Sequence, residues 1–311
     1  MKRLSTGLLF GVLTFTSCAQ SSNKQKIAAA SNTSPVQKSL LWKISGNGLD
    51  KPSYLFGTIH MLCEDDALLS PNMKSAIRNS DEVYLELDLD NMLEMLGAMS
   101  KLKMTGDTTL RDILSEQDYN KVKNYFESKQ SMIPFSMLET FKPILAASTL
   151  QEGDLPCDNT AAMEEVIMRE AKEHQKTISG LETMSYQAGM LDSIPYRLQA
   201  QQLVSYIDSS GKSDASEIKE MLTAYKEQDL VKLEAIINKS DAGISKFTEI
   251  LLYNRNRNWV KKLKTLMPGK SLVVAVGAGH LPGDQGVINL LKKEGYTVEA
   301  LENKIVKSKE I

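Results

Sequence analysis

The stretch "SLVVAVGAGHLPGDQG", residues 271–286, decides the fold, because a continuous apolar run leads into a glycine-flanked histidine and then into turn residues. A short apolar run that ends in turn signals predicts a buried strand. His280 stands where that strand ends. Since open α/β sheets bind ligands outside the carboxyl ends of their strands, the stretch predicts an α/β fold with a candidate site at His280.

A second apolar run, "YLFGTIH", ends with the same G-x-x-H spacing, so that Gly57 and His60 correspond to Gly277 and His280. A glycine three residues before the histidine lets the backbone approach a ligand or a neighbouring strand without obstruction by a Cβ atom. One G-x-x-H pattern has low specificity. Two copies at equivalent strand ends predict that the two histidines act together.

The remaining histidine, His174, lies in the charged stretch "REAKEHQKT". A cation at the end of a helix is favourable against the helix dipole, so a structural role explains His174 fully. It therefore serves as an internal control for the other two.

Further strands surround these two runs. Within residues 39–60, apolar and polar residues alternate in two short runs, with Gly-Asn-Gly and Lys-Pro turn residues between them, and this pattern predicts a hairpin. "DEVYLELDLD", residues 81–90, predicts a third strand that carries Glu86, and "KTISGLETM" predicts another short strand that carries Glu182. The alternation also permits plain solvent exposure of Glu86.

Between Met92 and Met267 the apolar spacing is helical. Expected helices cover residues 115–129, 159–174 with Asp158 or Asn159 as the cap, 216–238 and 243–267. We therefore predict one α/β domain over residues 40–311: a central mixed sheet with a large helical insertion between the N-terminal strands and the C-terminal strand.

The N-terminus has the pattern of a bacterial export signal. Lys2 and Arg3 precede an apolar stretch, and small residues directly precede Cys18. This predicts a lipoprotein signal peptide over residues 1–17, a lipid on Cys18, and a flexible tether over residues 18–39. Ala19 favours the outer membrane, since an aspartate at that position is associated with inner-membrane retention in enteric bacteria.

The composition is that of an ordinary globular protein, with 311 residues, 42% hydrophobic and 24% charged. Lys and Arg number 37 against 39 acids; removal of Lys2 and Arg3 with the signal gives 35 − 39 = −4. Nothing in this balance suggests a nucleic-acid partner.

The predicted export signal would place Cys63 and Cys157 in an oxidising compartment, where disulfides form and persist. They can form a disulfide that pins the helical insertion beside the site, or remain two independent buried thiols.

The chain resembles the TraB/GumN family, which is related to the Tiki metalloproteases and more distantly to erythromycin esterase-like and ChaN-like proteins. The resemblance covers about residues 40–302. The matching features are "YLFGTIH", "VYLELD", "GLETMSYQ", the "NRNRNW" helix and "VVAVGAGHLPGDQGVINLLKKEGYTV".

The resemblance assigns catalytic roles to His60, Glu86, His280 and Arg255, with Asn256 as a supporting residue. Two imidazoles and a carboxylate suffice for a hydrolytic metal centre with an open position. The resemblance to Tiki proteins implies manganese or cobalt, and the same ligands also accept zinc. The resemblance implies a hydrolase of peptide or protein substrates, above all a metal-dependent peptidase, and the predicted lipid anchor places it in the cell envelope.

Three alternatives stay open. In a metal-free version, Glu86 or His60 is the general base and Arg255 stabilises the developing oxyanion. ChaN-like relatives suggest a lipoprotein that binds haem or another metal-containing cofactor. Some TraB-like proteins suggest a regulator that sequesters a peptide without cutting it.

Overall fold

The computed structural model describes residues 38–129, 133–152, 155–209, 212–239 and 245–306. The predicted signal peptide, Cys18 and residues 18–37 of the predicted tether lie outside these ranges. Ser39, which the sequence assigns to the tether, belongs to the fold, because it is buried and its hydroxyl donates to Leu301 O at 2.6 Å.

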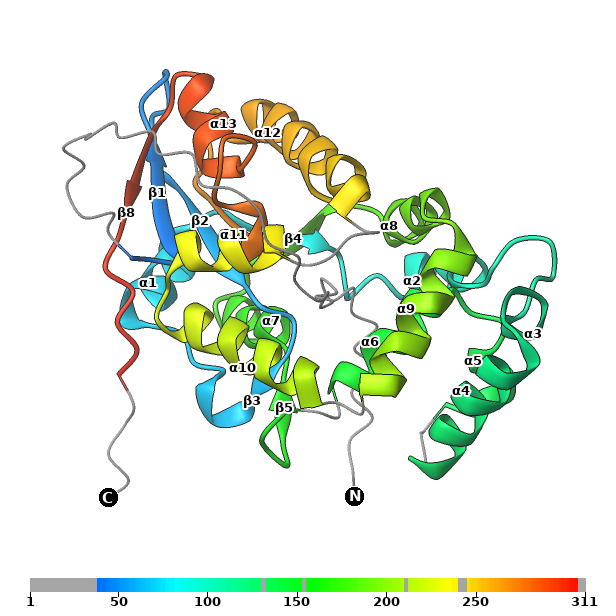
Figure 1. Ribbon diagram of the computed structural model, residues 1–311. Helices are drawn as coiled ribbons and strands as arrows, with labels where there is room; N and C mark the ends of the chain where they lie inside the picture. The colour runs from blue at the N-terminus through cyan, green and yellow to red at the C-terminus, as the bar shows by residue number, and fades with distance from the viewer. Residues whose placement is uncertain (1–37, 130–132, 153–154, 210–211, 240–244, 307–311) are drawn as a thin grey trace, which may run out of the picture.

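A six-stranded mixed sheet forms the centre of the molecule (Figure 1). Its order is β6 (Thr177–Glu182), β4 (Glu82–Leu87), β7 (Leu272–Gly277), β2 (Ser53–Thr58), β1 (Leu41–Ser45) and β8 (Thr297–Ala300). The first four strands are parallel, whereas β1 runs antiparallel to β2 and β8 antiparallel to β1. The predicted mixed sheet, the hairpin and the strands that carry Glu86 and Glu182 are confirmed.

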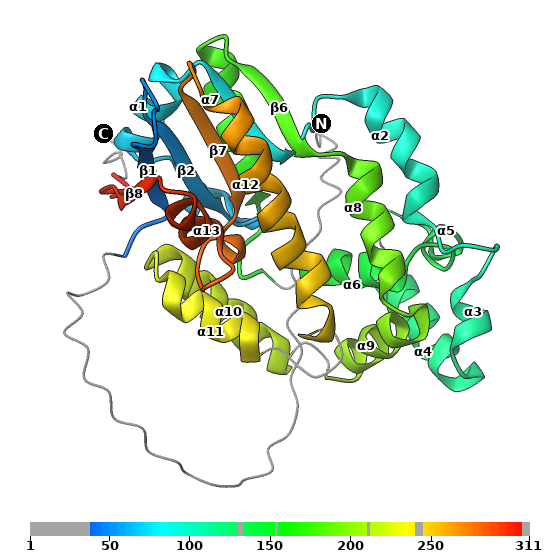
Figure 2. The same ribbon diagram turned by 90° about the horizontal axis from the view of Figure 1, so that it is seen from above.

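Helices cover both faces of this sheet. α12 (Asn254–Leu266) and α13 (Val287–Lys293) lie on one face, and α1 (Pro71–Asn79) and α7 (Met163–Glu173) lie on the other (Figures 1 and 2). The central strand β7 is apolar and buried, as expected for a strand that is covered on both sides. A two-stranded ribbon of β3 (Leu62–Cys63) and β5 (Thr160–Ala161) follows the end of β2.

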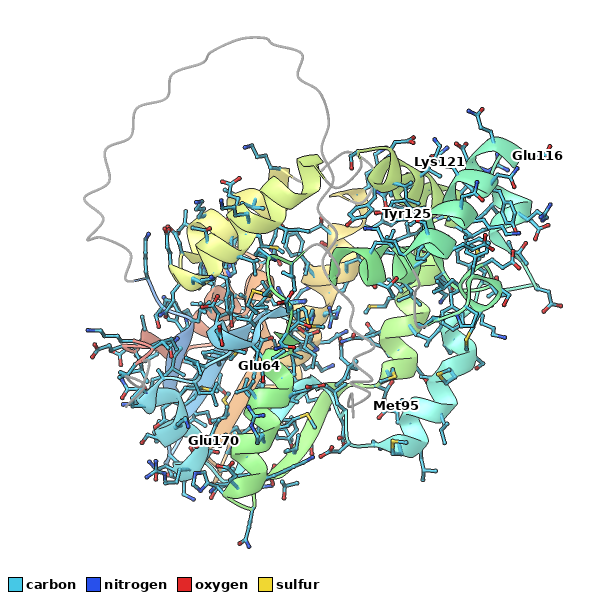
Figure 3. All side chains as sticks on the ribbon, turned by 90° about the horizontal axis from the view of Figure 1, so that it is seen from below. Glu64, Met95, Glu116, Lys121, Tyr125 and Glu170 are labelled. Atoms are coloured by element: carbon cyan, nitrogen blue, oxygen red, sulfur yellow. A yellow bond between two sulfur atoms is a disulfide. The ribbon has the colours of Figure 1, made fainter. Side chains whose placement is uncertain are left out.

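A helical lobe stands beside the sheet and has its own apolar cluster, which includes Phe126, Leu203 and Tyr206. Figure 3 shows Tyr125 in this lobe and Glu170 on the sheet side. The lobe comprises α2 (Met92–Ala98), α3 (Leu110–Ile113), α4 (Glu116–Ser128), α5 (Phe135–Leu138), α6 (Pro143–Glu152), α8 (Met184–Met190) and α9 (Tyr196–Ser209). Within the described ranges, no helix has the length and apolar character needed to cross a membrane.

Two helix predictions were wrong in detail. The helix expected over residues 216–238 is two helices, α10 (Lys212–Lys226) and α11 (Leu230–Lys239), because the chain reverses at Gln228 with φ of 57°. α7 begins only at Met163, since Thr160 and Ala161 pair with β3; neither Asp158 nor Asn159 caps it.

The expected helix over residues 243–267 contains a π-helical segment, Glu249–Tyr253, directly before α12. Short 3₁₀ helices complete the described chain: Glu64–Asp66, Met99–Leu102, Leu191–Ser193, Ser245–Phe247 and Ala278–His280.

Candidate active site

The four side chains that the sequence places on strand ends gather at the carboxyl edge of the parallel strands. Glu86 is the fifth residue of β4 and Glu182 the last of β6, while His60 and His280 follow β2 and β7 by two and three residues. These four strands are neighbours in the sheet. The edge is where an open α/β sheet places a ligand site.

Glu86 is the most heavily bonded acid of this edge. Its Oε1 accepts from the Gly277 N–H at 2.7 Å, and its Oε2 accepts from Arg255 Nη2 at 2.5 Å and from Gln187 Nε2 at 3.2 Å. Burial alone would raise the pKa of Glu86, but the charge of Arg255, with a smaller contribution from His60 and a hydrogen bond from the Gly277 N–H, holds that pKa well below its usual range. Glu86 is therefore a fixed anion and a poor proton acceptor.

Arg255 connects three of these groups from α12. Its Nη2 donates to Glu86, its Nε to Glu182 Oε2 at 2.9 Å, and its Nη1 faces His280 Nε2 at 3.1 Å. The π-helical segment ends two residues before Arg255, and such segments often occur at functional sites. Arg257, its neighbour on the helix, is exposed and pairs with Glu249, so helix phase separates the two arginines.

His280 is held neutral. The side-chain amide of Asn256 donates to the backbone oxygens of His280 and Gln285, which turns its Oδ1 toward His280 Nδ1 at 2.6 Å. An amide oxygen only accepts, so Nδ1 carries the proton and Nε2 accepts from Arg255. Burial, reinforced by the charge of Arg255, lowers the pKa of His280 to about 3. The Trp259 ring lies 4.5 Å from the imidazole.

His60, in contrast to His280, is held in its protonated, positively charged form. Its Nδ1 lies 2.9 Å from Glu164 Oε1, and Thr58 Oγ1 donates to the same oxygen at 2.7 Å. Burial alone would lower the pKa of His60, but the Glu164 carboxylate outweighs it and raises that pKa to about 9. The side chain is 21% exposed, and among the described residues its ring bonds through Nδ1 to Glu164, which leaves Nε2 open.

Sequence reasoning missed Glu164, which lies in α7 and is 5% exposed. A signal was present: Glu164 shares a helix face with Ile167, Met168 and Ala171, all of them buried. A carboxylate at an apolar position of an amphipathic helix needs a partner, and that partner is His60. Gln187 was also missed, because its approach to Glu86 depends on how α8 packs against the sheet.

The glycines of both motifs make close approaches. A Cβ atom on Gly277 would lie 3.2 Å from Glu86 Oε1, at the place where the Gly277 N–H bonds that carboxylate. A Cβ atom on Gly57 would lie 3.1 Å from Ala278 Cα and 3.2 Å from Leu281 Cδ2. Gly57 thus lets the two histidine turns pack against each other.

A disulfide joins Cys63 and Cys157, with their Cα atoms 5.8 Å apart. Cys63 lies three residues after His60 and pairs with Thr160 in the β3–β5 ribbon. The ribbon leads directly into α7. The cross-link therefore ties the turn that carries His60 to the helix that carries Glu164.

The predicted ligand set of His60, Glu86 and His280 does not fit a metal ion in this arrangement. Arg255 bonds both Glu86 and His280 and uses the lone pair of His280 Nε2, which lies 3.9 Å from Glu86 Oε1, while His280 Nδ1 carries a proton. Its positive charge also opposes a cation there. Across the described ranges, no three His, Cys, Asp or Glu side chains are grouped closely enough to hold a metal.

Comparisons with known proteins identify distant relatives of this chain. The chain is 23% identical to "Metalloprotease TIKI1" of Danio rerio and 24% identical to "Metalloprotease TIKI1" of Homo sapiens, in each case over 84% of this chain and 63% or 61% of the relative. It thus spans about three fifths of their length. The names of these relatives describe metal-dependent proteolysis.

A bacterial relative is closer to this chain in length. "Uncharacterized protein YbaP" of Shigella flexneri is 23% identical over 78% of this chain and 89% of its own length. No solved structure matches. The profile of the TraB/PrgY/gumN family covers residues 40–300, which include every strand of the sheet and every residue of the candidate site. This chain therefore belongs to the TraB/PrgY/gumN family.

Proposed function

We propose that the chain is a hydrolase of peptide bonds in the cell envelope and that His60 is its proton-transfer group. One observation carries the proposal: at the carboxyl edge of the sheet, a partly exposed imidazole with an open Nε2 is fixed by a buried carboxylate, beside a charged network. The similarity to proteins named metalloproteases supports hydrolysis as the reaction class.

The chemistry follows from the partners of His60. Because the pKa of His60 is raised to about 9, only a small fraction of His60 is neutral at pH 7, and this fraction takes a proton from water at Nε2 as the water attacks the scissile carbonyl. His60 then returns that proton to the leaving amine, and the rate should rise as the pH rises toward 9. Glu164 orients the ring through Nδ1 and stabilises the imidazolium that forms, as carboxylates do in other hydrolytic sites. Glu86 is too weak a base for this role, because both its oxygens accept hydrogen bonds from neighbouring N–H groups.

The test compares wild type, His60→Gln and His174→Gln on a peptide library. We expect His60→Gln to lower kcat/KM by about 100-fold or more, because general acid–base catalysis contributes that much, and His174→Gln to leave it unchanged. Equal activity in His60→Gln and wild type would contradict the proposal. Chelator treatment, followed by addition of manganese or zinc, belongs in the same assay, because the relatives named metalloproteases imply a divalent metal.

A second candidate, a regulator that binds a peptide without cutting it, is favoured by one observation. The polar atoms of Glu86 and His280 are all bonded within the protein, which is typical of a structural network. Saturable binding of library peptides with no cleavage product would support this candidate. A Soret band on haem titration would instead identify a haem-binding lipoprotein.

The proposed location is the outer membrane, through a lipid on Cys18. Mass spectrometry of the mature protein should find an acylated Cys18 at its N-terminus, since several acyl chains on one residue give stable attachment. A mature species that begins at another residue would contradict the anchor, and the hydrolase proposal would be unaffected.

A further inference from the structure

A pocket of about 190 Å³ lies beside the turn that carries His60. It is formed by β2, β3, α7, α10 and the segment after β8. Its apolar walls are Leu40, Phe56, Leu62, Leu68, Met163 and Ile305. A dry cavity of about 150 Å³ accepts benzene, so this pocket has room for a phenyl or isobutyl group.

The polar groups at this pocket already have partners. Lys226 pairs with Asp66 at 2.5 Å. Gln228 Oε1 accepts from Leu40 N at 3.1 Å and from Asn303 Nδ2 at 3.0 Å, and Gln228 Nε2 donates to Asn303 O at 2.8 Å. A polar ligand would have to compete with these bonds. The pocket therefore selects an apolar group, whose affinity comes from burial.

The walls of the pocket are also the supports of the site. The Tyr225 hydroxyl, on the α10 side of the pocket, donates to Gly57 O at 3.1 Å, three residues before His60. Leu62 follows His60 by two residues, and Met163 directly precedes Glu164, the partner of His60 Nδ1. An occupant of the pocket thus contacts the segments that hold the proton-transfer group.

We propose that this pocket anchors one bulky apolar side chain of the peptide substrate, of leucine, methionine or phenylalanine type. The inference rests on the proposed peptide hydrolysis. It specifies the substrate class: peptides with a large apolar residue at a fixed separation from the scissile bond. Of the lining residues, Leu68 and Ile305 are half-buried, so the pocket is accessible from solvent at these two walls, and a side chain can enter there while the peptide backbone stays outside.

Binding is measured apart from hydrolysis. Full-length protein is titrated with N-acetyl-leucinamide and N-acetyl-phenylalaninamide, and with N-acetyl-glycinamide as the control probe, while the methyl NMR signals of Met163 and Ile305 are followed. We expect both apolar probes to shift these signals saturably and the glycine probe to leave them unchanged. Absence of a shift at the solubility limit of the apolar probes would overturn the proposal.

Two variants and their controls locate the binding. Leu68→Trp fills the pocket, whereas Val231→Trp adds the same ring at a 57% exposed position elsewhere. Ile305→Ser removes an apolar wall, and Val306→Ser changes an exposed neighbour that is not part of the lining. We expect Leu68→Trp and Ile305→Ser to weaken probe binding at least about tenfold, as expected when a pocket loses the burial of one side chain. Equal weakening in the controls would contradict the assignment.

A position-scanned library completes the test. Wild type should prefer leucine or phenylalanine over alanine about tenfold in kcat/KM at one fixed position, and Ile305→Ser should lose that preference while cleaving the alanine peptide as before. A preference that survives in Ile305→Ser would overturn the proposal. No cleavage of any peptide, with probe binding intact, would refute the proposed function and with it the substrate role of the pocket.

Discussion

The two G-x-x-H turns end neighbouring parallel strands and have the same spacing, yet their histidines differ in almost every physical respect. His60 faces the carboxylate of Glu164 from α7, on one side of the sheet, and is partly exposed. His280 faces the guanidinium of Arg255 from α12, on the other side, and is 3% exposed. The pKa of His60 is raised to about 9, and that of His280 is lowered to about 3.

This contrast shows that the G-x-x-H motif determines where each histidine lies, whereas the helix that faces the histidine determines whether it is charged. Ionisable groups whose environments push their pKa values apart usually have separate roles in a reaction. In the proposed function, the partly exposed His60 is the proton-transfer group and the buried His280 is not. His280, with Arg255, holds Glu86 and Glu182 in a buried network that shapes the edge of the sheet.

The largest expected effect on stability comes from the buried ion pairs that Arg255 makes beside His280. Arg255→Met leaves Glu86 and Glu182 buried without a counter-charge, so the free energy of unfolding should fall by about 3–5 kcal/mol. The measurement is urea denaturation at pH 7. Arg257→Met, at the exposed neighbouring position, should cost less than about 1 kcal/mol. Equal losses of unfolding free energy in the two variants would mean that the buried ion pairs of Arg255 stabilise the fold no more than an exposed pair does.

The disulfide tests the His60 side. Cys63→Ala with Cys157→Ala opens a cross-link of sequence separation 94 and should lower the free energy of unfolding by about 2–4 kcal/mol. Because the bond ties the His60 turn to α7, the histidine NMR signals should change at His60 and stay the same at His280. Equal changes at both would contradict the separation of the two sides.

A smaller effect is expected from Glu164→Gln, which keeps the shape of the side chain and removes its charge. The pKa of His60 is raised on folding from its usual value near 6.5 to about 9. The charged pair therefore contributes fully below pH 6.5, and its contribution falls as the pH rises through 9. Its loss should cost on the order of 2 kcal/mol near pH 6 and little near pH 10.

Urea denaturation at the two pH values measures this difference. Glu173→Gln, a change of an exposed carboxylate on the same helix, is the matched control and should not alter the pH dependence in this range. If the free energy of unfolding changed equally with pH in wild type and in Glu164→Gln, Glu164 would not be the group that keeps His60 charged.

Much of this arrangement was predictable, because strand ends are encoded locally. The apolar run before His280 and the embedded Glu86 fixed which residues meet at the sheet edge. Their partners were less predictable. Glu164 stands 104 residues after His60, and only the packing of α7 brings the two together. The charge states of the histidines depend on those partners.

The ligand set was the least predictable feature. Two histidines and a glutamate at one edge indicate a metal centre by type, but the direction of Arg255 depends on the helix phase set by the π-helical segment before it. The same limit explains why α10 and α11 look like one helix in the sequence, since Gln228 gives no glycine or proline signal at the break.

The most direct test of the account is a ¹⁵N NMR titration of the three histidines from pH 4 to pH 10, with assignment by His60→Gln, His174→Gln and His280→Gln. The account predicts that His60 is protonated on both nitrogens at pH 7 and loses a proton with a pKa near 9. His280 should stay neutral over the whole range, with its proton on Nδ1. A His280 that titrates near 6.5, or a His60 that is neutral at pH 7, would contradict the division of roles between the two strand ends.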